Sequence, residues 1–299
     1  MRALACTAAI AAVAMLSVAG CGSGTDPSGN TEPPGGSVPS GVPRFGATAT
    51  QPPTPTATTA SGPARALPIY YLADTQAGPR LYREFHALPE FDDPATDALR
   101  ELFANRTGMD PDYRSYWPAG AGLRTPVRHD NGVITVDVNP EAIKVRLEHP
   151  EGPLTIQQLV YTVQGALQST DPVRLLVDGS PYTTVFSTFV SEPIERGDAH
   201  ETRSLVQIDQ PAYGADIART FEVTGEAATF EANVGWQILR GGQVVKSGFA
   251  TAQEGGRFSA YRFSVTLEPG DYTLRVVEDD PSGGAGRPPF EDTKLIHIH

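Results

Sequence analysis

The stretch that decides the fold of the first half of the chain is residues 154–167, which read LTIQQLVYTVQGAL. Its apolar side chains recur at spacings of three and four residues, at Ile156, Leu159, Val160, Val163, Ala166 and Leu167. This spacing places them on one face of an amphipathic α-helix. Thr155 followed by Gln158 has the pattern of a capping box, so we expect the helix to start beside Thr155. Residues 173–177, VRLLV, then read as a short apolar strand.

Upstream of this helix, some segments have apolar residues at the two-residue period of strands and others at the spacing of helices. Residues 67–73 and 80–86 both read as strands. Residues 93–94 (Asp-Pro) supply a helix N-cap and a proline at the first helical position, so a helix begins there. Residues 130–132 (Asp-Asn-Gly) predict the turn of a hairpin. The order strand, strand, helix, strand, strand, helix, strand predicts an α+β domain, a sheet with two helices on one face.

The C-terminal third of the chain shows the period of two that is typical of strands. The clearest alternation is at Phe230, Ala232, Val234, Trp236 and Ile238. Similar runs occur at residues 263–267, 272–276 and 296–298, with turn signals between them. Several short strands at this spacing predict an all-β immunoglobulin-like sandwich. Because this part of the chain has no cysteine pair, its core must hold by packing, and we expect Trp236 at its centre.

The N-terminus indicates a compartment. A short positive start precedes an apolar run at residues 3–19, which suits the core of a signal peptide. Residues 18–21 (Val-Ala-Gly-Cys) resemble the lipobox of bacterial lipoproteins. The resemblance implies that residues 1–20 are removed and that Cys21 carries acyl chains, which anchor the protein to the extracytoplasmic face of the cell membrane. The alternative is an ordinary secretory signal peptide with an incidental cysteine.

Four further segments follow from composition. Residues 21–66 form a disordered tether, because 30 of the 45 residues from position 22 to 66 are Pro, Gly, Ser or Thr. Residues 67–192 hold the α+β domain, residues 193–204 a polar linker, and residues 205–299 the β-sandwich.

Both predicted domains resemble known families. The first resembles the sporulation and spore-germination domain called GerMN, and the second resembles the immunoglobulin-like domain of bacterial spore germination. The residues that carry the resemblance are 132–138 (GVITVDV), 154–163, 173–179, 206–211 (VQIDQP), 221–227 (FEVTGEA) and 269–274 (PGDYTL). The resemblance implies an extracytoplasmic, non-enzymatic role in scaffolding or binding at the cell envelope.

Charge and motifs exclude several classes of function. The formal net charge of −12 argues against nucleic acid as a partner. The acidity is shared, with −7 in residues 67–192 and −6 in residues 193–299, so it marks no single site. Residues 200–204 (HETRS) miss the zinc motif His-Glu-x-x-His because Ser204 stands at the second ligand position. His297 and His299 share one strand face, which we interpret as a polar strand end. We therefore predict no catalytic residue, metal site or cofactor.

One loop carries candidate ligand-binding residues. Residues 110–118 read DPDYRSYWP and hold Tyr113, Tyr116 and Trp117 beside acids. Exposed aromatic side chains of this kind stack on sugar rings or anchor a partner protein. The alternative is that Tyr116 and Trp117 fold back onto the first helix and the sheet.

Three functions are consistent with the sequence. The first is a tethered lipoprotein that binds or scaffolds envelope proteins. The second is a peptidoglycan- or glycan-binding module, and the third is an envelope hydrolase with an unrecognised site. The oligomeric state stays open.

Overall fold

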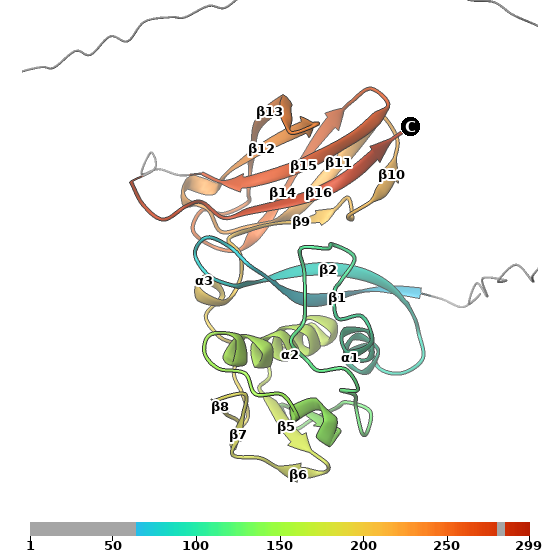
Figure 1. Cartoon of the computed structure of the whole chain (residues 1–299), viewed down its shortest axis with the longest axis vertical. Coiled ribbons are helices and arrows are strands. Elements are labelled where there is room, and N and C mark those ends of the chain that lie inside the picture. Colours follow the sequence, from blue (N-terminus) through green and yellow to red (C-terminus); the bar gives the residue numbers. More distant parts are fainter. Residues whose placement is uncertain (1–63, 280–284) are drawn as a thin grey trace, which may run out of the picture. The chain divides into compact units, whose positions relative to one another are not determined.

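The computed structural model describes residues 64–279 and 285–299, which contain a domain of helices and strands followed by an all-β domain (Figure 1). The predicted fold class, an α+β domain before an immunoglobulin-like sandwich, is confirmed. The predicted signal peptide, Cys21 and the tether up to residue 63 lie outside the described residues. Within the described ranges, no helix has the length and apolar character needed to cross a membrane.

The first domain follows the predicted order of elements. Its elements are β1 (Ala64–Ala73), β2 (Arg80–Pro89), α1 (Pro94–Ala104), β3 (Arg128–Asp130), β4 (Val133–Val138), the 3-10 helix η1 (Pro140–Ile143), α2 (Glu151–Leu167), β5 (Val173–Val177), β6 (Ser180–Pro181), β7 (Thr184–Val185) and β8 (Thr188–Phe189). Strand β1 starts three residues before the predicted domain boundary.

The larger strands of this domain form two sheets instead of the single sheet expected. Strands β1 and β2 pair with each other as an antiparallel hairpin, whereas β3, β4, β5 and β6 form a second sheet in that order. Helices α1 and α2 lie between the hairpin and the second sheet (Figure 1). One apolar core joins the layers, with Ile69 on β1, Leu99 on α1, Val160 on α2 and Val136 on β4 all fully buried.

Helix α1 begins as the sequence predicts. The Asp93 side chain accepts hydrogen bonds from the backbone N–H groups of Ala95 and Thr96, and Pro94 occupies the first helical position. These bonds satisfy N–H groups that a helix start otherwise leaves without partners. Leu99 and Leu102 then fall on the buried face.

The predicted start of α2 is wrong. The helix begins at Glu151, before Thr155, and it has no side-chain cap at its N-terminus. The Thr155 hydroxyl donates instead to the Glu151 carbonyl at 2.7 Å, one turn back in the helix. Gln158 donates from its amide to the Tyr70 carbonyl at 2.8 Å, so it ties α2 to β1. Both residues are polar groups inside the domain, and the pattern of a capping box is coincidental here.

The segment from residue 193 to 204 is polar in sequence but largely packed. Ile194 forms a β-bridge with Val173. Residues Ala199–Thr202 form the short helix α3, and Arg203 and Ser204 are buried. The Ser204 N–H donates to the carbonyl of Leu81 in β2 at 3.0 Å. This segment therefore packs against the first domain along its length instead of spanning a gap as a free linker.

The second domain is a sandwich of two sheets. Its elements are β9 (Val206–Gln210), β10 (Ala215–Ile217), β11 (Thr220–Ala227), the 3-10 helix η2 (Phe230–Ala232), β12 (Asn233–Arg240), β13 (Gln243–Thr251), β14 (Ser259–Thr266), β15 (Gly270–Glu278) and β16 (Glu291–Ile298). One sheet has the order β10-β16-β15-β12-β13, and the other has the order β14-β11-β9.

Two predictions for the sandwich are wrong in detail. The alternation that starts at Phe230 continues into β12, but Phe230 itself is 62% exposed and Glu231 and Ala232 have positive φ, so the strand starts only at Asn233. Trp236 is not central: it is half-buried and stacks on Phe263 with ring centroids 5.0 Å apart. Tyr261, which is 2% exposed, fills the interior.

Gly152 allows the first turn of α2 to pass close to the turn between β7 and β8. A Cβ atom built on Gly152 would lie 2.1 Å from the Phe186 carbonyl oxygen, a backbone atom that cannot rotate away. We expect Gly152→Ala to lower the free energy of unfolding by about 1–3 kcal/mol, as overpacking typically does. Chemical denaturation measures this. The matched control is Gly122→Ala, whose added methyl meets its nearest atom at 3.5 Å; an equal loss in both variants would contradict the contact.

Candidate functional site at the domain junction

The two domains have separate apolar cores. The main buried cluster of the first domain takes its members from residues 67 to 190, and that of the second domain takes its members from residue 205 onward. Among the described residues, the second cluster draws only Ala77 from the first domain. The domains nevertheless belong to one compact unit. Polar contacts therefore have to carry much of the junction between them.

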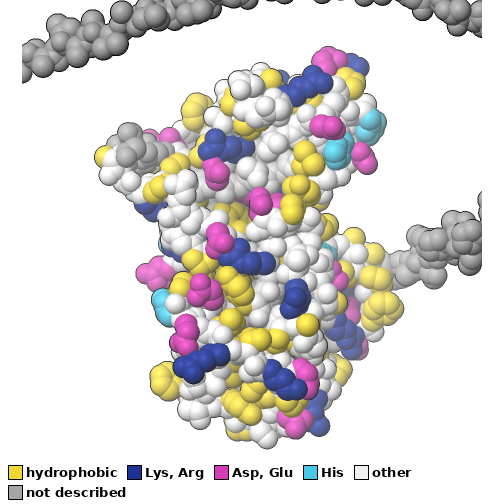
Figure 2. Space-filling view, viewed as in Figure 1, with side chains coloured by type: hydrophobic (Ala, Val, Ile, Leu, Met, Phe, Trp, Pro, Cys, Tyr) yellow, Lys and Arg dark blue, Asp and Glu magenta, His cyan; other side chains and the backbone are white. Residues whose placement is uncertain are grey.

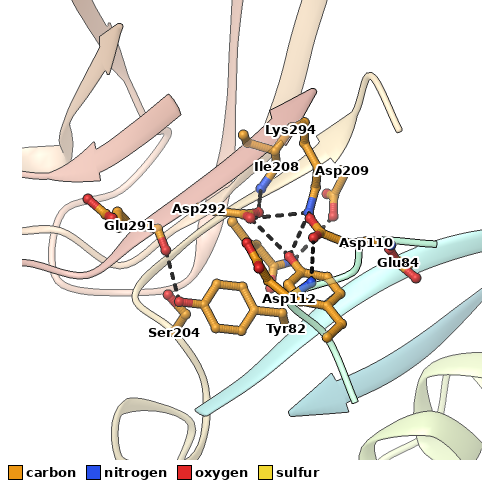
Figure 3. A network of polar contacts seen from close by, with 12 residues as sticks. Tyr82, Glu84, Asp110, Asp112, Ser204, Ile208, Asp209, Glu291, Asp292 and Lys294 are labelled. Carbon is orange, nitrogen blue, oxygen red and sulfur yellow. Dashed lines mark hydrogen bonds and ion pairs between the residues drawn. The ribbon is translucent and has the colours of Figure 1, made fainter. Parts of the chain in front are cut away.

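The centre of the junction is a buried lysine. Lys294 on β16 is 2% exposed, and its ammonium donates to Asp110 Oδ2 at 2.7 Å, to Tyr113 Oη at 2.7 Å and to Asp292 Oδ1 at 3.1 Å. Asp110 and Tyr113 belong to the first domain, in the loop after α1. Figure 3 shows Lys294 and Asp292 pointing from β16 toward Asp110. All three donor positions of the ammonium are thus used, across both domains.

The partners of Lys294 are themselves held in place. Tyr113 Oη donates to Asp292 Oδ1 at 3.0 Å, and the Ile208 N–H on β9 donates to Asp292 Oδ2 at 2.7 Å. We name the set Asp110, Tyr113, Asp292 and Lys294 the junction network. Because an unpaired buried charge is costly, this network holds together only while the domains stay in contact.

Glu84 on β2 positions the loop that carries Asp110. Its carboxylate accepts from the Met109 N–H and from the Asp110 N–H, both at 2.9 Å. Gly108 precedes these residues with a φ of +67°, and a Cβ there would lie 2.8 Å from Glu84 Oε2. The glycine therefore supplies both the left-handed backbone and the room that this close approach requires.

A second set of ion pairs lies on the other face of β2. Arg83 donates to Asp209 Oδ2 at 2.6 Å and to Glu226 Oε1 at 3.1 Å, and both acids belong to the second domain. Arg203 donates to Glu226 Oε2 at 2.7 Å. On the Glu84 face of β2, Tyr82 Oη donates to the Glu291 carbonyl at 2.8 Å. Three consecutive residues of β2 thus contact or position the junction on both sides of the strand.

Burial and charge oppose each other in the junction network. Burial alone would lower the pKa of Lys294, but Asp292 and Asp110 outweigh it and raise that pKa above its usual value. Burial raises the pKa of Asp292, and the charge of Lys294 opposes this. Burial also raises the pKa of the Tyr113 hydroxyl. Lys294 therefore stays charged and Tyr113 stays a hydrogen-bond donor at neutral pH.

A cleft of about 480 Å³ opens beside the network. It is lined by Ala73, Asp74, Tyr82, Asp110, Pro111, Asp112, Tyr113, Arg114, Glu291, Asp292 and Thr293. Several of its acids are already paired, as Asp74 is with Arg114 and Glu291 with Arg275. In the described part of the chain, no three His, Cys, Asp or Glu side chains are grouped so that they would hold a metal ion.

The predicted aromatic residues lie in different environments. Trp117 is fully buried, and its ring meets Phe103 at 5.3 Å and Phe186 at 5.2 Å in edge-to-face geometry. Tyr113 is 3% exposed and belongs to the junction network, whereas Tyr116 is half-buried and its hydroxyl accepts from Arg114 Nε at 3.0 Å. The exposed rings expected on this loop are therefore not what the structure has for Tyr113 and Trp117: Trp117 packs onto α1, as the alternative expects, and Tyr113 serves the junction.

The histidines singled out in the sequence have ordinary partners. His297 Nδ1 lies 2.7 Å from Asp271 Oδ1 at the surface. His200 Nε2 lies 3.1 Å from the Gly256 carbonyl oxygen. Neither residue contacts the junction network.

Sequence reasoning missed Asp292 and Lys294, although a signal for them was present. Ile296 and Ile298 alternate at the end of the last strand, and both are buried, so they mark its inward face. Continuing the same period of two toward the N-terminus puts Lys294 and Asp292 on that face. Two charged residues at inward positions indicate a buried ion pair. Their partner Asp110 in the first domain, which lies 182 and 184 positions before them along the chain, has no such signal.

The family comparison agrees with this architecture. Residues 68–183 match the family model described as "Sporulation and spore germination", and residues 205–285 match the model described as "Immunoglobulin-like domain of bacterial spore germination". The chain therefore carries a GerMN-type domain followed by a spore-germination immunoglobulin-like domain. The junction network joins these two domains, with Asp110 and Tyr113 in the first matched segment and Lys294 beyond the end of the second. No curated protein matches the chain.

Among solved structures, the tandem GerMN domains of the sporulation protein GerM from Bacillus subtilis share 18% identity with a TM-score of 0.39. The match covers 45% of this chain, which in turn spans 45% of that one. The fibronectin(III)-like modules of Clostridium thermocellum CbhA share 18% identity, with a TM-score of 0.22, over 31% of this chain and 93% of the module.

Removing the Lys294 ammonium tests the junction network. We expect Lys294→Met to lower the free energy of unfolding by about 3–5 kcal/mol, because Asp110 and Asp292 then stay buried without a cation. Denaturant titration of the full-length chain measures this loss. Lys246→Met is the matched control, since Lys246 is exposed and its loss costs within about 0.5 kcal/mol. Similar small losses in both variants would show that the buried lysine does not hold the junction.

Proposed function

We propose that this chain is a lipid-anchored protein on the extracytoplasmic face of the cell membrane. Its GerMN-type and immunoglobulin-like domains act there as one rigid, non-enzymatic scaffold that binds envelope proteins. The observation that carries the scaffold part is the contact of Lys294 with Asp110 and Asp292, which fixes two separately cored domains to each other. The family descriptions support it, because both refer to sporulation or spore germination and name no reaction.

Rigid coupling matters for a scaffold because it fixes the surface that a partner meets. A partner that contacts both domains pays no ordering entropy if their relative geometry is already set. The face of the molecule drawn in Figure 2 intersperses acidic and basic side chains, without a field of one sign. Such a surface suits specific protein contacts better than steering of a polyanion.

Envelope proteins are favoured over cell-wall glycan as partners. The glycan alternative relied on exposed aromatic rings at Tyr113, Tyr116 and Trp117. Two of these side chains are buried, and Tyr116 is held by Arg114. We therefore propose that Asp110 and Tyr113 serve the junction and Trp117 the core of the first domain, and that this loop does not stack on sugars.

The anchor is tested by changing the lipobox cysteine. We expect Cys21→Ser to release the protein from the membrane fraction or to leave it unprocessed at a higher mass, because the thiol that accepts the lipid is gone. Fractionation and intact-mass measurement read this out. Cys6→Ser is the matched control, since Cys6 lies within the predicted signal peptide and its loss leaves the mature protein unchanged. A Cys21→Ser protein that stays in the membrane at the mass of the processed wild type would contradict lipid anchoring.

The scaffold role is tested by cross-linking in intact cells with identification of the captured proteins. We expect a reproducible envelope protein to be captured by the wild-type chain and by Lys246→Met, and its yield to fall severalfold for Lys294→Met at equal expression. The reason is that the second domain loses its fixed position in that variant alone. Equal capture by all three chains would show that partner binding does not depend on the rigid junction. Turnover of cell-wall or ester substrates by the purified chain would instead support a hydrolase.

A further inference from the structure

His86 lies buried between two carboxylates in the GerMN-type domain. It is 5% exposed, with Nδ1 2.8 Å from Glu101 Oε1 on α1 and Nε2 3.1 Å from Glu84 Oε2 on β2. The third ionisable group that faces it is Tyr71 on β1, whose ring stacks on the imidazole at a centroid distance of 5.9 Å. Burial and the charges of Glu84 and Glu101 raise the pKa of Tyr71, so it stays neutral.

The geometry requires two donors on the imidazole. A neutral imidazole carries one N–H, whereas both of its nitrogens here face a carboxylate oxygen. Only the imidazolium donates to Glu84 and Glu101 at once. Loss of the proton therefore leaves one of the two carboxylates without its hydrogen bond from His86, and leaves two negative charges without the cation between them.

Glu84 connects this histidine to the domain junction. The Glu84 oxygen that accepts from His86 Nε2 also accepts from the Met109 N–H, and the other Glu84 oxygen accepts from the Asp110 N–H. Asp110 then contacts Lys294, whose neighbour Asp292 accepts from the Ile208 N–H in the second domain. Each step is a direct hydrogen bond or ion pair, so the position of Glu84 decides where Asp110 lies.

We propose that His86 is a charge-dependent positioning residue, and that its deprotonation at alkaline pH loosens the contact between the two domains. The domains themselves keep their apolar cores when this happens. The device is a pH-sensitive junction, and it does not depend on where the protein is anchored or which partner it binds.

The direction of the effect follows from the environment of His86. Burial lowers its pKa, but the hydrogen bonds and charges of Glu101 and Glu84 outweigh burial and raise the pKa to about 9, from a usual value of 6.5. A group whose pKa is raised in the folded state contributes stability that is complete below its unfolded value and disappears as pH rises through the folded value. The His86 contribution is therefore present at pH 6.5 and lost by the time the pH has passed about 9.

The test measures the distance between one label on each domain as a function of pH. Thr170→Cys and Ser264→Cys place labels at exposed positions in the full-length chain, with Cys6 and Cys21 changed to serine. Electron-spin measurement should give a narrow distribution of label-to-label distances near pH 6.5 and a broader distribution at higher pH. Half of the broadening should have occurred near pH 9. NMR titration of the His86 ring should show the same midpoint. A distance that stays narrow to about pH 10 overturns the proposal.

Three variants separate a charge effect from a structural one. Glu101→Gln removes one anionic neighbour and should lower the midpoint by about one pH unit. His86→Gln should give a broad distribution that is independent of pH. His129→Gln, which removes an exposed histidine paired with Asp171, should leave the midpoint unchanged. An unshifted midpoint in Glu101→Gln overturns the proposal even if His86→Gln fails to fold.

Discussion

A lysine ammonium that is almost fully removed from water needs anionic partners, and Lys294 takes one of them from each domain. Moving a single charge into a protein interior costs several kcal/mol unless it is paired and hydrogen-bonded. Asp110 and Asp292 provide the pairing, and Tyr113 provides the remaining acceptor. The arrangement of the two domains depends on this constraint, because the described residues offer no comparable apolar contact between them: the second core draws only Ala77 from the first domain.

A polar junction restricts the relative orientation of two domains more than an apolar junction does. Apolar contacts are non-directional and tolerate small rotations, whereas hydrogen-bonded ion pairs fix distances and angles. Replacing a buried ion network by well-packed apolar residues often leaves stability unchanged or raises it, so we do not regard the network as a source of stability. We interpret it as the element that selects one relative geometry. The ion pairs of Arg83 with Asp209 and Glu226 add a second fixed point on the other face of the same strand.

Much of the fold could be predicted from the sequence because it rests on local patterns. The spacing of Leu159, Val160 and Val163 identified α2, and the Asp93-Pro94 pair identified the start of α1. The family resemblance of both domains was also visible in short motifs and agrees with the matched models. Local patterns failed where a polar group had a tertiary partner. Thr155 and Gln158 imitated a capping box, although Gln158 bonds to β1.

The site itself was largely beyond prediction. Tyr113 was selected for its aromatic ring, whereas its role depends on its hydroxyl and on Lys294, 181 positions away. Glu84 and His86 fall within a segment that reads only as a strand, and alternation shows which face a residue occupies but not what lies opposite. For Trp117 the sequence left exposure and packing onto the first helix both open, because its place between Phe103 and Phe186 depends on how α1 and the β7–β8 turn approach it.

The most direct test of the central claim is the relative orientation of the two domains in solution. Residual dipolar couplings of the full-length chain at neutral pH, with Cys6 and Cys21 changed to serine, report the alignment of each domain separately. A rigid junction predicts that couplings from residues 64–204 and from residues 205–299 fit one common alignment tensor. Two tensors of different magnitude or orientation would show that the domains move independently, and would contradict the account.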